Sequence, residues 1–187
     1  MFEQTTVSLS VLAQDAHNLS AAEFEQRYGA SFLVHAGTLD TGMSPLLRTL
    51  TDRDNMAAWG GGEALQVFLV RPKASNVFPD FISIGRAANN DVVITHPSVS
   101  KFHAYLRRQP EGLRLYDAAS ANGTFSDNDR VAVKGRGAPT ILTSGVSLRF
   151  GMVDVMFLGV EQLRGLAQTL VQQLPPAASS PLVANSR

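Results

Sequence analysis

The sequence predicts a mainly β protein: an antiparallel β-sandwich of about eleven strands, with short helical segments before it and one helix after it. Short apolar segments fill residues 63–159, several alternate with polar residues, and turn residues separate them. No amphipathic stretch of helical length interrupts this zone. After residue 160, leucines recur at three- and four-residue spacing, which is typical of a helix with one apolar face. Together these observations indicate a sandwich followed by a helix.

Residues 1–62 are expected to form an N-terminal extension that is partly helical. Ser20 is followed by Glu23, the pattern of a capping box, and this predicts a helix over residues 21–28. Three consecutive glycines at 60–62 cannot hold a helix or strand cheaply, so we place a domain boundary there. Two further elements are expected in this extension, a strand over residues 31–35 and a helix over residues 44–50.

The predicted domain of residues 63–159 consists of short strands. Leu113 and Leu115 alternate with polar neighbours, as expected for a strand with one buried face. The strands are expected at residues 65–71, 81–85, 92–94, 104–108, 113–117, 130–133, 140–142, 146–150 and 153–158. Residues 160–174 form the predicted C-terminal helix, which two prolines end, and residues 175–187 are expected to be a disordered tail.

Composition excludes several classes of function. The 187 residues contain 16 Lys+Arg and 16 Asp+Glu, so the formal net charge is zero and no broad basic field for nucleic acid exists. Cysteine is absent and the four histidines show no metal-ligand spacing, so we expect no metal and no cofactor. No apolar run is long enough to insert into a membrane and no secretory leader is visible, so we expect a cytoplasmic protein.

Four short polar elements lie at strand ends or turns within the β zone. A sandwich can bring such loops together at one edge, and loops on a rigid scaffold commonly carry recognition. Each element alone has an ordinary structural explanation, such as a hairpin turn or a solvated charge. The four elements are residues 85–86, 90–91, 100–103 and 120–124.

The side chains of these loops suit a phosphate monoester held beside a peptide backbone. Arg86 offers paired donors to phosphate oxygens, and Ser100 and Lys101 add further donors. The carboxamide of Asn122 can pair with a peptide N–H or C=O. No nucleophile with an adjacent base is visible, so the sequence predicts a binding protein and no enzyme.

The order of these elements resembles the forkhead-associated (FHA) domain family, over about residues 64–158. The resemblance implies an eleven-stranded sandwich that binds phosphothreonine peptides through its apical loops. It rests on Leu69, Ile82, residues 84–86, 90–92, 99–104, 113–117 and 120–125, Val131, Leu142, Gly145, Leu148 and residues 150–151.

The resemblance also implies roles for individual residues. Arg86 and Ser100 look like the direct phosphate contacts, and Lys101 would assist them. Asn122 resembles the residue that holds the peptide main chain beside the phosphothreonine. His103 is expected to tie the Ser100 loop to its neighbour by hydrogen bonding. Two glycines match positions that shape the loops without touching ligand, Gly85 and Gly123.

Two departures from the family pattern would weaken such a site. Ala121 stands where many members carry a polar side chain, which removes one contact worth about 0.5–1.5 kcal/mol. Asp127 and Asp129 add negative charge after the motif, and they would repel phosphate if their loop lay beside it.

Thr51 is a candidate phosphorylation site within the N-terminal extension. Many FHA domains select their peptides by the residue three places after the phosphothreonine, and Asp54 has that spacing. Phosphorylated Thr51 would then bind the FHA site of its own chain or of a second copy. The simpler interpretation is that Thr51 is an ordinary loop residue.

Two functions therefore remain open. The first is a phosphothreonine-dependent signalling adaptor, whose partner is a phosphorylated protein, either a bacterial-type Ser/Thr kinase or its substrate. The second is a phospho-independent scaffold, for example in a secretion or regulatory complex. The helix over residues 160–174 is expected to pack on its own sandwich, with partner binding through its leucines as the alternative.

Overall fold

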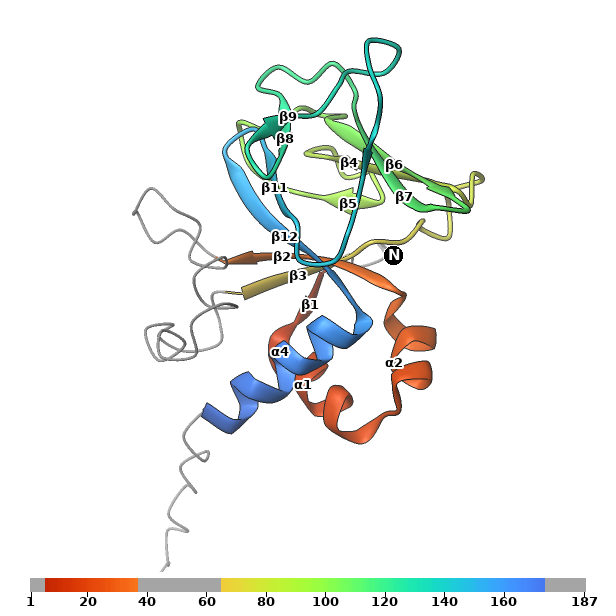
Figure 1. The fold of residues 1–187 in the computed structure, drawn as a ribbon. Coiled ribbons are helices and arrows are strands. Elements are labelled where there is room, and N and C mark those ends of the chain that lie inside the picture. The colour runs from red at the N-terminus through yellow and green to blue at the C-terminus, as the bar shows by residue number, and fades with distance from the viewer. Residues whose placement is uncertain (1–5, 37–64, 174–187) are drawn as a thin grey trace, which may run out of the picture.

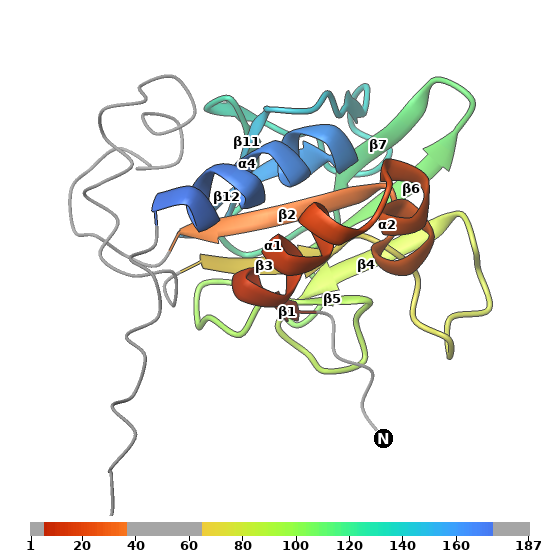
Figure 2. The same ribbon diagram turned by 90° about the horizontal axis from the view of Figure 1, so that it is seen from below.

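The computed structural model describes residues 6–36 and 65–173, which form three stacked layers. A five-stranded sheet packs on a seven-stranded sheet, and helices cover the other face of the larger sheet (Figures 1 and 2). The predicted helix over 44–50, the glycines at 60–62, Thr51 and the tail after residue 175 lie outside the described residues.

Twelve strands build the two sheets of the described part. The larger sheet has the order β1-β3-β2-β12-β11-β8-β9, and its strands are β1 (Thr6–Ser8), β2 (Ser31–Ala36), β3 (Leu65–Leu69), β8 (Thr124–Ser126), β9 (Asp129–Arg130), β11 (Ser147–Phe150) and β12 (Val153–Gly159). The smaller sheet has the order β10-β7-β6-β4-β5, and its strands are β4 (Phe81–Gly85), β5 (Val92–Val93), β6 (Ala104–Gln109), β7 (Gly112–Asp117) and β10 (Thr140–Ile141). Neighbouring strands are antiparallel, except that β4 and β5 are parallel.

The predicted mainly β fold is therefore confirmed, and each predicted strand overlaps an observed one. Strands β1 and β8 were missed, as was helix α1 (Leu9–Asn18). β8 has three residues and lies directly after the Asn122–Gly123 turn, so it is too short to show an alternating pattern. The predicted capping box is confirmed, because the Ser20 hydroxyl accepts from the Glu23 N–H at the start of α2 (Ala21–Tyr28).

The middle of the larger sheet, strands β3, β2 and β12, is buried on both faces, which explains the continuous apolar sequence of β2. Leu33 faces the smaller sheet and joins the core between the sheets, whereas Phe32 and Val34 face the helices. β2 lies between β3 and β12, pairing with both. A strand from the predicted N-terminal extension is thus central to the sheet, while the division of the chain at residue 62 stays a prediction.

Helix α4 (Val160–Gln173) packs on its own sandwich together with α1 and α2. Leu163 and Ala167 are fully buried in the helical core. The Arg164 guanidinium donates to the carbonyl oxygens of Ala16 (3.3 Å) and Leu19 (2.8 Å), so it satisfies groups at the end of α1. The expectation that this helix covers its own sheet is confirmed, with Leu163 and Leu166 buried.

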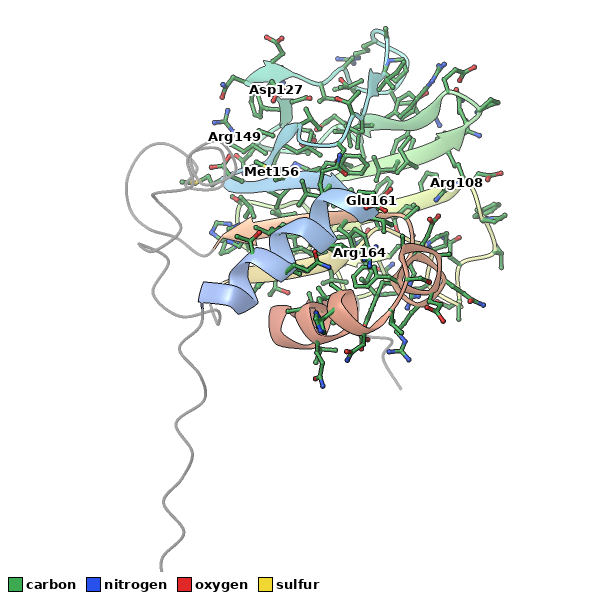
Figure 3. The ribbon with its side chains drawn as sticks, turned by 60° about the horizontal axis from the view of Figure 1, so that its bottom comes forward. Arg108, Asp127, Arg149, Met156, Glu161 and Arg164 are labelled. Carbon is green, nitrogen blue, oxygen red and sulfur yellow. The ribbon has the colours of Figure 1, made fainter. Side chains whose placement is uncertain are left out.

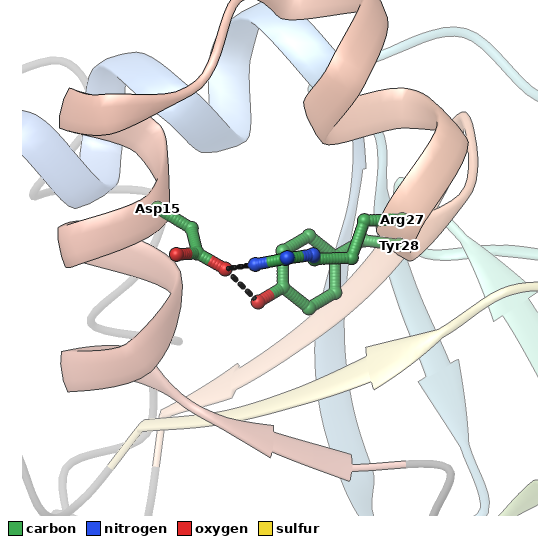
Figure 4. A network of polar contacts seen from close by, with 3 residues as sticks. All are labelled: Asp15, Arg27 and Tyr28. Atoms are coloured by element: carbon green, nitrogen blue, oxygen red, sulfur yellow. Dashed lines mark hydrogen bonds and ion pairs between the residues drawn. The ribbon is translucent and has the colours of Figure 1, made fainter.

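A polar network joins α1 to α2 at the surface (Figure 4). The Asp15 carboxylate accepts hydrogen bonds from the Tyr28 hydroxyl and from the Arg27 guanidinium, the latter at 2.6 Å. These bonds, that of Tyr28 first, lower the pKa of Asp15 below its ordinary value. The network fixes the angle at which the two helices meet over the sheet.

Replacing Phe32 with alanine tests whether β2 is integral to the fold. Phe32 is fully buried and its ring lies 6.2 Å from that of Phe24, so the cavity left behind should cost about 3–5 kcal/mol of unfolding free energy. Denaturant unfolding followed by circular dichroism measures this loss. The control Val11→Ala changes a side chain that is 48% exposed, and it should stay within about 0.5 kcal/mol. Equal, small effects of both substitutions would contradict a central role for β2.

Candidate functional site

Three loops meet where β4 ends, β6 begins and β7 leads to β8. They are residues 86–91, 98–103 and 118–123, and we call them together the apical edge. Figure 1 shows the strands that carry them. All four ligand-type side chains expected from the sequence lie in these loops: Arg86, Ser100, Lys101 and Asn122.

Close backbone contacts join the first loop to the second. The N–H of Arg86 donates to the Ser100 carbonyl at 2.9 Å, and the Asn90 side chain donates to the Lys101 carbonyl at 2.6 Å. A Cβ atom on Gly85 would lie 2.4 Å from the Lys101 carbonyl oxygen, closer than any real contact. Glycine at position 85 is therefore required for the two loops to approach.

The buried ring of His103 joins the second loop to the third. Its Nδ1 accepts from the Ser100 N–H at 3.0 Å, and its Nε2 donates to the Gly123 carbonyl at 3.1 Å. The ring is fully buried and lies edge-on to Phe150. Burial lowers the pKa of His103 below its ordinary value, against the opposing effect of the hydrogen bond to Gly123, so the ring is neutral.

A carboxylate that the sequence analysis did not single out for binding orders the third loop. Buried Asp117 accepts from the Ser120 N–H (2.9 Å), the Ser120 hydroxyl (2.6 Å) and the Thr124 hydroxyl (2.7 Å). Burial alone would raise the pKa of Asp117, but these hydrogen bonds outweigh it and the pKa lies below its ordinary value. The sequence signal is an aspartate at a strand end with serine three residues later, a typical Asx turn.

Asp91 has a comparable structural role at the other side of the apical edge. Its buried carboxylate accepts from the Lys73 N–H, the Asn76 side chain, and both the N–H and hydroxyl of Ser83. All four distances lie between 2.7 and 2.9 Å. Asp91 therefore anchors the loop before β4 and is not open to a ligand.

Arg86 is exposed, and its guanidinium is tethered on one side. Nε donates to the Val99 carbonyl at 3.0 Å. Within the described residues, the two terminal nitrogens of Arg86 have no protein acceptor. The hydroxyl of Ser100 accepts from the Ala121 N–H at 3.1 Å, which leaves its own proton available. The side chain of Lys101 is exposed beside them.

Asn122 and the β11–β12 turn meet at Ser98. The Asn122 amide donates to the Ser98 carbonyl at 2.8 Å, and the Ser98 hydroxyl accepts from the Met152 N–H at 2.9 Å. A Cβ atom on Gly151 would lie 2.5 Å from the Ser98 carbonyl oxygen, so glycine is needed there too. Asn122 is exposed, and its side-chain oxygen has no donor among the described residues.

A shallow hollow of about 320 Å³ adjoins Arg86. Its lining consists of Arg86, Thr95, His96 and Pro97. The His96 Nδ1 lies 2.7 Å from the Ser98 hydroxyl and accepts from the Ser98 N–H at 3.2 Å, so the wall of the hollow is itself hydrogen-bonded. Residues 95–97 carry none of the polar patterns by which the sequence indicates the other loops.

The acidic residues after the motif do not lie beside the expected phosphate position. Asp127 is at the far end of β8 from Asn122, where its carboxylate accepts from the Ser147 N–H at 3.1 Å (Figure 3). Strand β9 follows the β8–β9 turn and runs antiparallel to β8, so it carries Arg130 back toward the apical edge. A Cβ atom on Gly123 would lie 3.3 Å from the Arg130 guanidinium, so the charge beside the Asn122–Gly123 turn is positive.

Comparison with known proteins identifies the β domain. Residues 82–151 match the model of the FHA domain family, so the chain contains an FHA domain. It is 35% identical over 79 residues to the ABC transporter ATP-binding/permease protein Rv1747 of Mycobacterium tuberculosis, covering 42% of this chain but 8% of that protein.

Two solved structures of Mycobacterium tuberculosis proteins are also similar to the chain. The second FHA domain of the same transporter is 32% identical, with a TM-score of 0.37 and coverage of 45% of this chain and 72% of that one. EmbR in complex with a low-affinity phosphopeptide is 24% identical, with a TM-score of 0.38 and coverage of 43% of this chain and 20% of that one.

An FHA domain is a non-catalytic binding module, typically one for phosphothreonine. In the described part of the chain, no three His, Cys, Asp or Glu side chains are grouped so as to hold a metal ion. Nor is any helix of residues 6–36 and 65–173 long and apolar enough to cross a bilayer.

Neutral His103 should make the protein less stable in mild acid. Because the folded-state pKa of His103 lies below its ordinary value of 6.5, the unfolded chain takes up the proton first. The stability is complete above about pH 6.5 and is lost as the pH falls toward the folded-state pKa. Denaturant unfolding between pH 7.5 and 5 should show this loss, and His103→Gln should reduce the slope. An unchanged slope in the variant would contradict the assignment.

Proposed function

We propose that the apical edge binds phosphothreonine peptides, and that the protein is a signalling adaptor that reads the output of a Ser/Thr kinase. The observation that carries this proposal is the state of Arg86. Its guanidinium is held by Val99 through Nε while both terminal nitrogens stay open. That arrangement presents a fixed, two-pronged donor, the geometry that a phosphate accepts best.

Ser100 and Lys101 supply the remaining donors to the phosphate. The Ser100 hydroxyl already accepts from the Ala121 N–H, so its proton is directed to a new acceptor. The exposed ammonium of Lys101 adds a second positive charge to that of Arg86. The two positive charges balance the phosphate dianion, and the guanidinium, the ammonium and the hydroxyl can each donate to a phosphate oxygen.

Asn122 holds the peptide main chain. Its amide nitrogen is committed to the Ser98 carbonyl, which orients the side chain and leaves the oxygen as acceptor for a peptide N–H. Gly123 has φ of 81°, a conformation that favours glycine, so the turn that presents Asn122 depends on it.

The loops are ordered before any ligand arrives. Hydrogen bonds through His103, Asn90 and Ser100 link the three loops in the free protein. A site that is already ordered loses little conformational entropy on binding, which favours useful affinity from few contacts. A scaffold that had no phosphate ligand would not need a tethered Arg86 with open terminal nitrogens, so the adaptor is favoured over the phospho-independent scaffold.

The partner we propose is a phosphothreonine-containing protein, either a Ser/Thr kinase or a substrate of one. Such phosphorylation takes place in the cytoplasm, and we propose that compartment for this protein. The residues of the apical edge carry no information on which kinase is involved, so the peptide preference has to be measured.

Isothermal titration with a pool of phosphothreonine peptides tests the proposal. The wild-type chain should bind with a Kd on the order of micromolar. Arg86→Ala should weaken binding at least tenfold, because a hydrogen bond to a charged group is worth about 1.5–3 kcal/mol. Arg86→Lys should recover part of this loss of affinity, because lysine keeps the positive charge but lacks the paired N–H donors of the guanidinium.

The matched control is Arg149→Ala. The Arg149 guanidinium on β11 lies 4.3 Å from the centre of the Phe125 ring and is not among the proposed phosphate or peptide contacts, so its removal should leave affinity unchanged. Binding that persists after phosphatase treatment of the peptides, or in Arg86→Ala, would refute the proposal and favour the scaffold.

We also propose that phosphorylated Thr51 is one ligand of this site, in the same chain or in a second copy. Thr51 lies outside the described residues, but the ends of its segment are placed. Ala36 pairs with Leu65, and the neighbouring His35 ring lies 2.7 Å from the Asp154 carbonyl at the start of β12. β12 begins directly after the turn that contacts Ser98, so both ends of the segment leave the sheet at the apical end.

The length of the chain permits this contact. Thr51 is 14 residues before Leu65, and about 3.3–3.6 Å per extended residue gives a reach of roughly 45–50 Å. Such a tether raises the effective concentration of the phosphothreonine at the site. Asp54 provides an acidic residue three places after it.

The test compares the chain phosphorylated at Thr51 with the unphosphorylated chain. Phosphorylation should weaken the binding of a fluorescent phosphothreonine peptide at least tenfold, or should produce a dimer in light scattering. Arg86→Ala should abolish the dimer. A phosphorylated chain that remains monomeric and binds the peptide as before would contradict self-recognition, and it would leave binding of other phosphoproteins intact.

A further inference from the structure

A row of aromatic side chains crosses the outward face of the smaller sheet. We call Phe81, Phe102, Tyr105 and Tyr116 the aromatic row. Tyr105 on β6 is at its centre, with ring centroids 5.0 Å from Phe81 on β4 and 4.9 Å from Tyr116 on β7. Phe102 lies 6.2 Å from Tyr105 and is 45% exposed. Alternate residues of the same strands, such as Ile82 and Leu106, form the core between the sheets, so the row faces outward.

Positive charge surrounds the aromatic row. Arg107 is directly opposite Phe81 in the β4–β6 register and is exposed. The Lys134 ammonium lies 5.9 Å from the centre of the Tyr105 ring. Arg114, opposite Arg107 on β7, forms an ion pair with Glu111 at 3.1 Å. Arg107 and Lys134 have no acidic partner in the described part of the chain, so neither charge is neutralised by an ion pair.

No described element covers this face of the smaller sheet. The three helices α1, α2 and α4 all pack on the larger sheet, on the opposite side of the molecule (Figures 1 and 2). At the β10 edge, Ile141 pairs with Arg114 and is 50% exposed. Exposed apolar side chains gathered on one face and rimmed by charge mark an interaction surface.

The stacking of the rings argues against nucleic acid as the occupant. Bases bind proteins by stacking on open aromatic faces. The two faces of Tyr105 are already occupied by Phe81 and Tyr116, with interplanar angles of 22° and 4°. Tyr105 itself is only 4% exposed, so what the row can offer to a partner is the ring edges of Phe81, Phe102 and Tyr116. Such edges carry partial positive charge and attract oxygen atoms and carboxylates.

The charge also argues against a second copy of the chain. In a two-fold dimer, the same patch meets itself, so Arg107 and Lys134 would approach the same cations of the partner. Ring edges and unpaired cations both favour acidic groups instead. An acidic segment with some apolar side chains complements the face in charge and in hydrophobicity.

The aromatic row is continuous with the apical edge. Phe102 directly follows Lys101, and its ring lies 6.4 Å from that of Phe81. A chain that leaves the phosphate position past Lys101 therefore meets Phe102 first and the rest of the row next. Contacts here would add to those of the short phosphothreonine motif.

We infer that the aromatic row and its cations, Arg107 and Lys134, bind a second segment of the phosphorylated partner. This segment is acidic, contains apolar side chains, and flanks the phosphothreonine motif. The inference rests on the proposed function for the position of the phosphothreonine, but the row itself can be tested alone. It explains how a small phosphate site could select one partner among many phosphothreonine proteins.

The experiment uses the full chain and three phosphothreonine peptides with the same seven-residue core. The first is the core alone, the second adds ten residues of Glu and Leu on either side, and the third adds Gly and Ser. The acidic extension should tighten binding at least fivefold over the core, and the Gly/Ser extension should not. In the double variant Arg107→Glu, Lys134→Glu, the gain should disappear while the core peptide binds as in wild type.

Arg149→Glu is the control for the change of charge. Arg149 lies on β11 of the larger sheet, whereas Arg107 lies on β6 of the smaller sheet, and Figure 3 shows Arg149 and Arg108 of β6 far apart across the molecule. This variant should keep the gain from the acidic extension. Equal gains in the double variant and the wild type, or no gain from the acidic extension, would overturn the inference.

Three further outcomes are distinguished by the same variants. If the core peptide does not bind, the proposed function fails, and the unphosphorylated Glu/Leu peptide then tests the row by itself. Binding of this peptide that the double variant loses supports the row as a docking face for acidic segments. No binding of this peptide overturns the inference. Charge-dependent binding of a 15-mer of thymidine, or a dimer that dissociates in the double variant, would assign the face to nucleic acid or to a second copy and overturn the inference.

Discussion

The buried ring of His103 is the contact on which the candidate site depends. One nitrogen accepts from the Ser100 N–H and the other donates to the Gly123 carbonyl, so a single side chain sets the spacing of two loops. The bond from the Ser100 N–H requires Nδ1 to be unprotonated, and complete burial keeps the ring neutral. The position of the Ser100 hydroxyl and of the Asn122 turn follows from this one residue, because each lies within a residue or two of a bonded atom.

The layers beneath the loops supply the rigidity that this arrangement needs. Strands β3, β2 and β12 of the larger sheet are enclosed between the smaller sheet and the helices, and β2 pairs with β12 at the centre of the sheet. β12 continues from the turn at Gly151, whose N–H donates to the Gly123 carbonyl at 3.0 Å. The packing of β2 and the helices on β12 therefore also holds the turn at Gly151, which contacts the third loop of the apical edge. The remaining outward face, the aromatic row, is left for a partner.

Local chemistry was predictable from the sequence, and long-range placement was not. Ser20 with Glu23 and the alternating leucines of β7 signal their own conformations through capping and periodicity. The positions of Arg86, Ser100 and Asn122 at one edge followed from the family pattern. The central position of β2, the return of Arg130 to Gly123 and the stacking of Tyr105 with Tyr116 depend on strand register, which no local pattern encodes.

A crystal structure of the chain with a bound phosphothreonine peptide tests the central claim most directly. The account predicts phosphate oxygens within hydrogen-bond distance of the terminal nitrogens of Arg86 and of the Ser100 hydroxyl. It also predicts a peptide N–H on the Asn122 oxygen, with His103 keeping both of its present hydrogen bonds. A peptide bound elsewhere, or loops that rearrange and break the His103 bonds, would contradict the account of an edge ordered in advance for phosphothreonine.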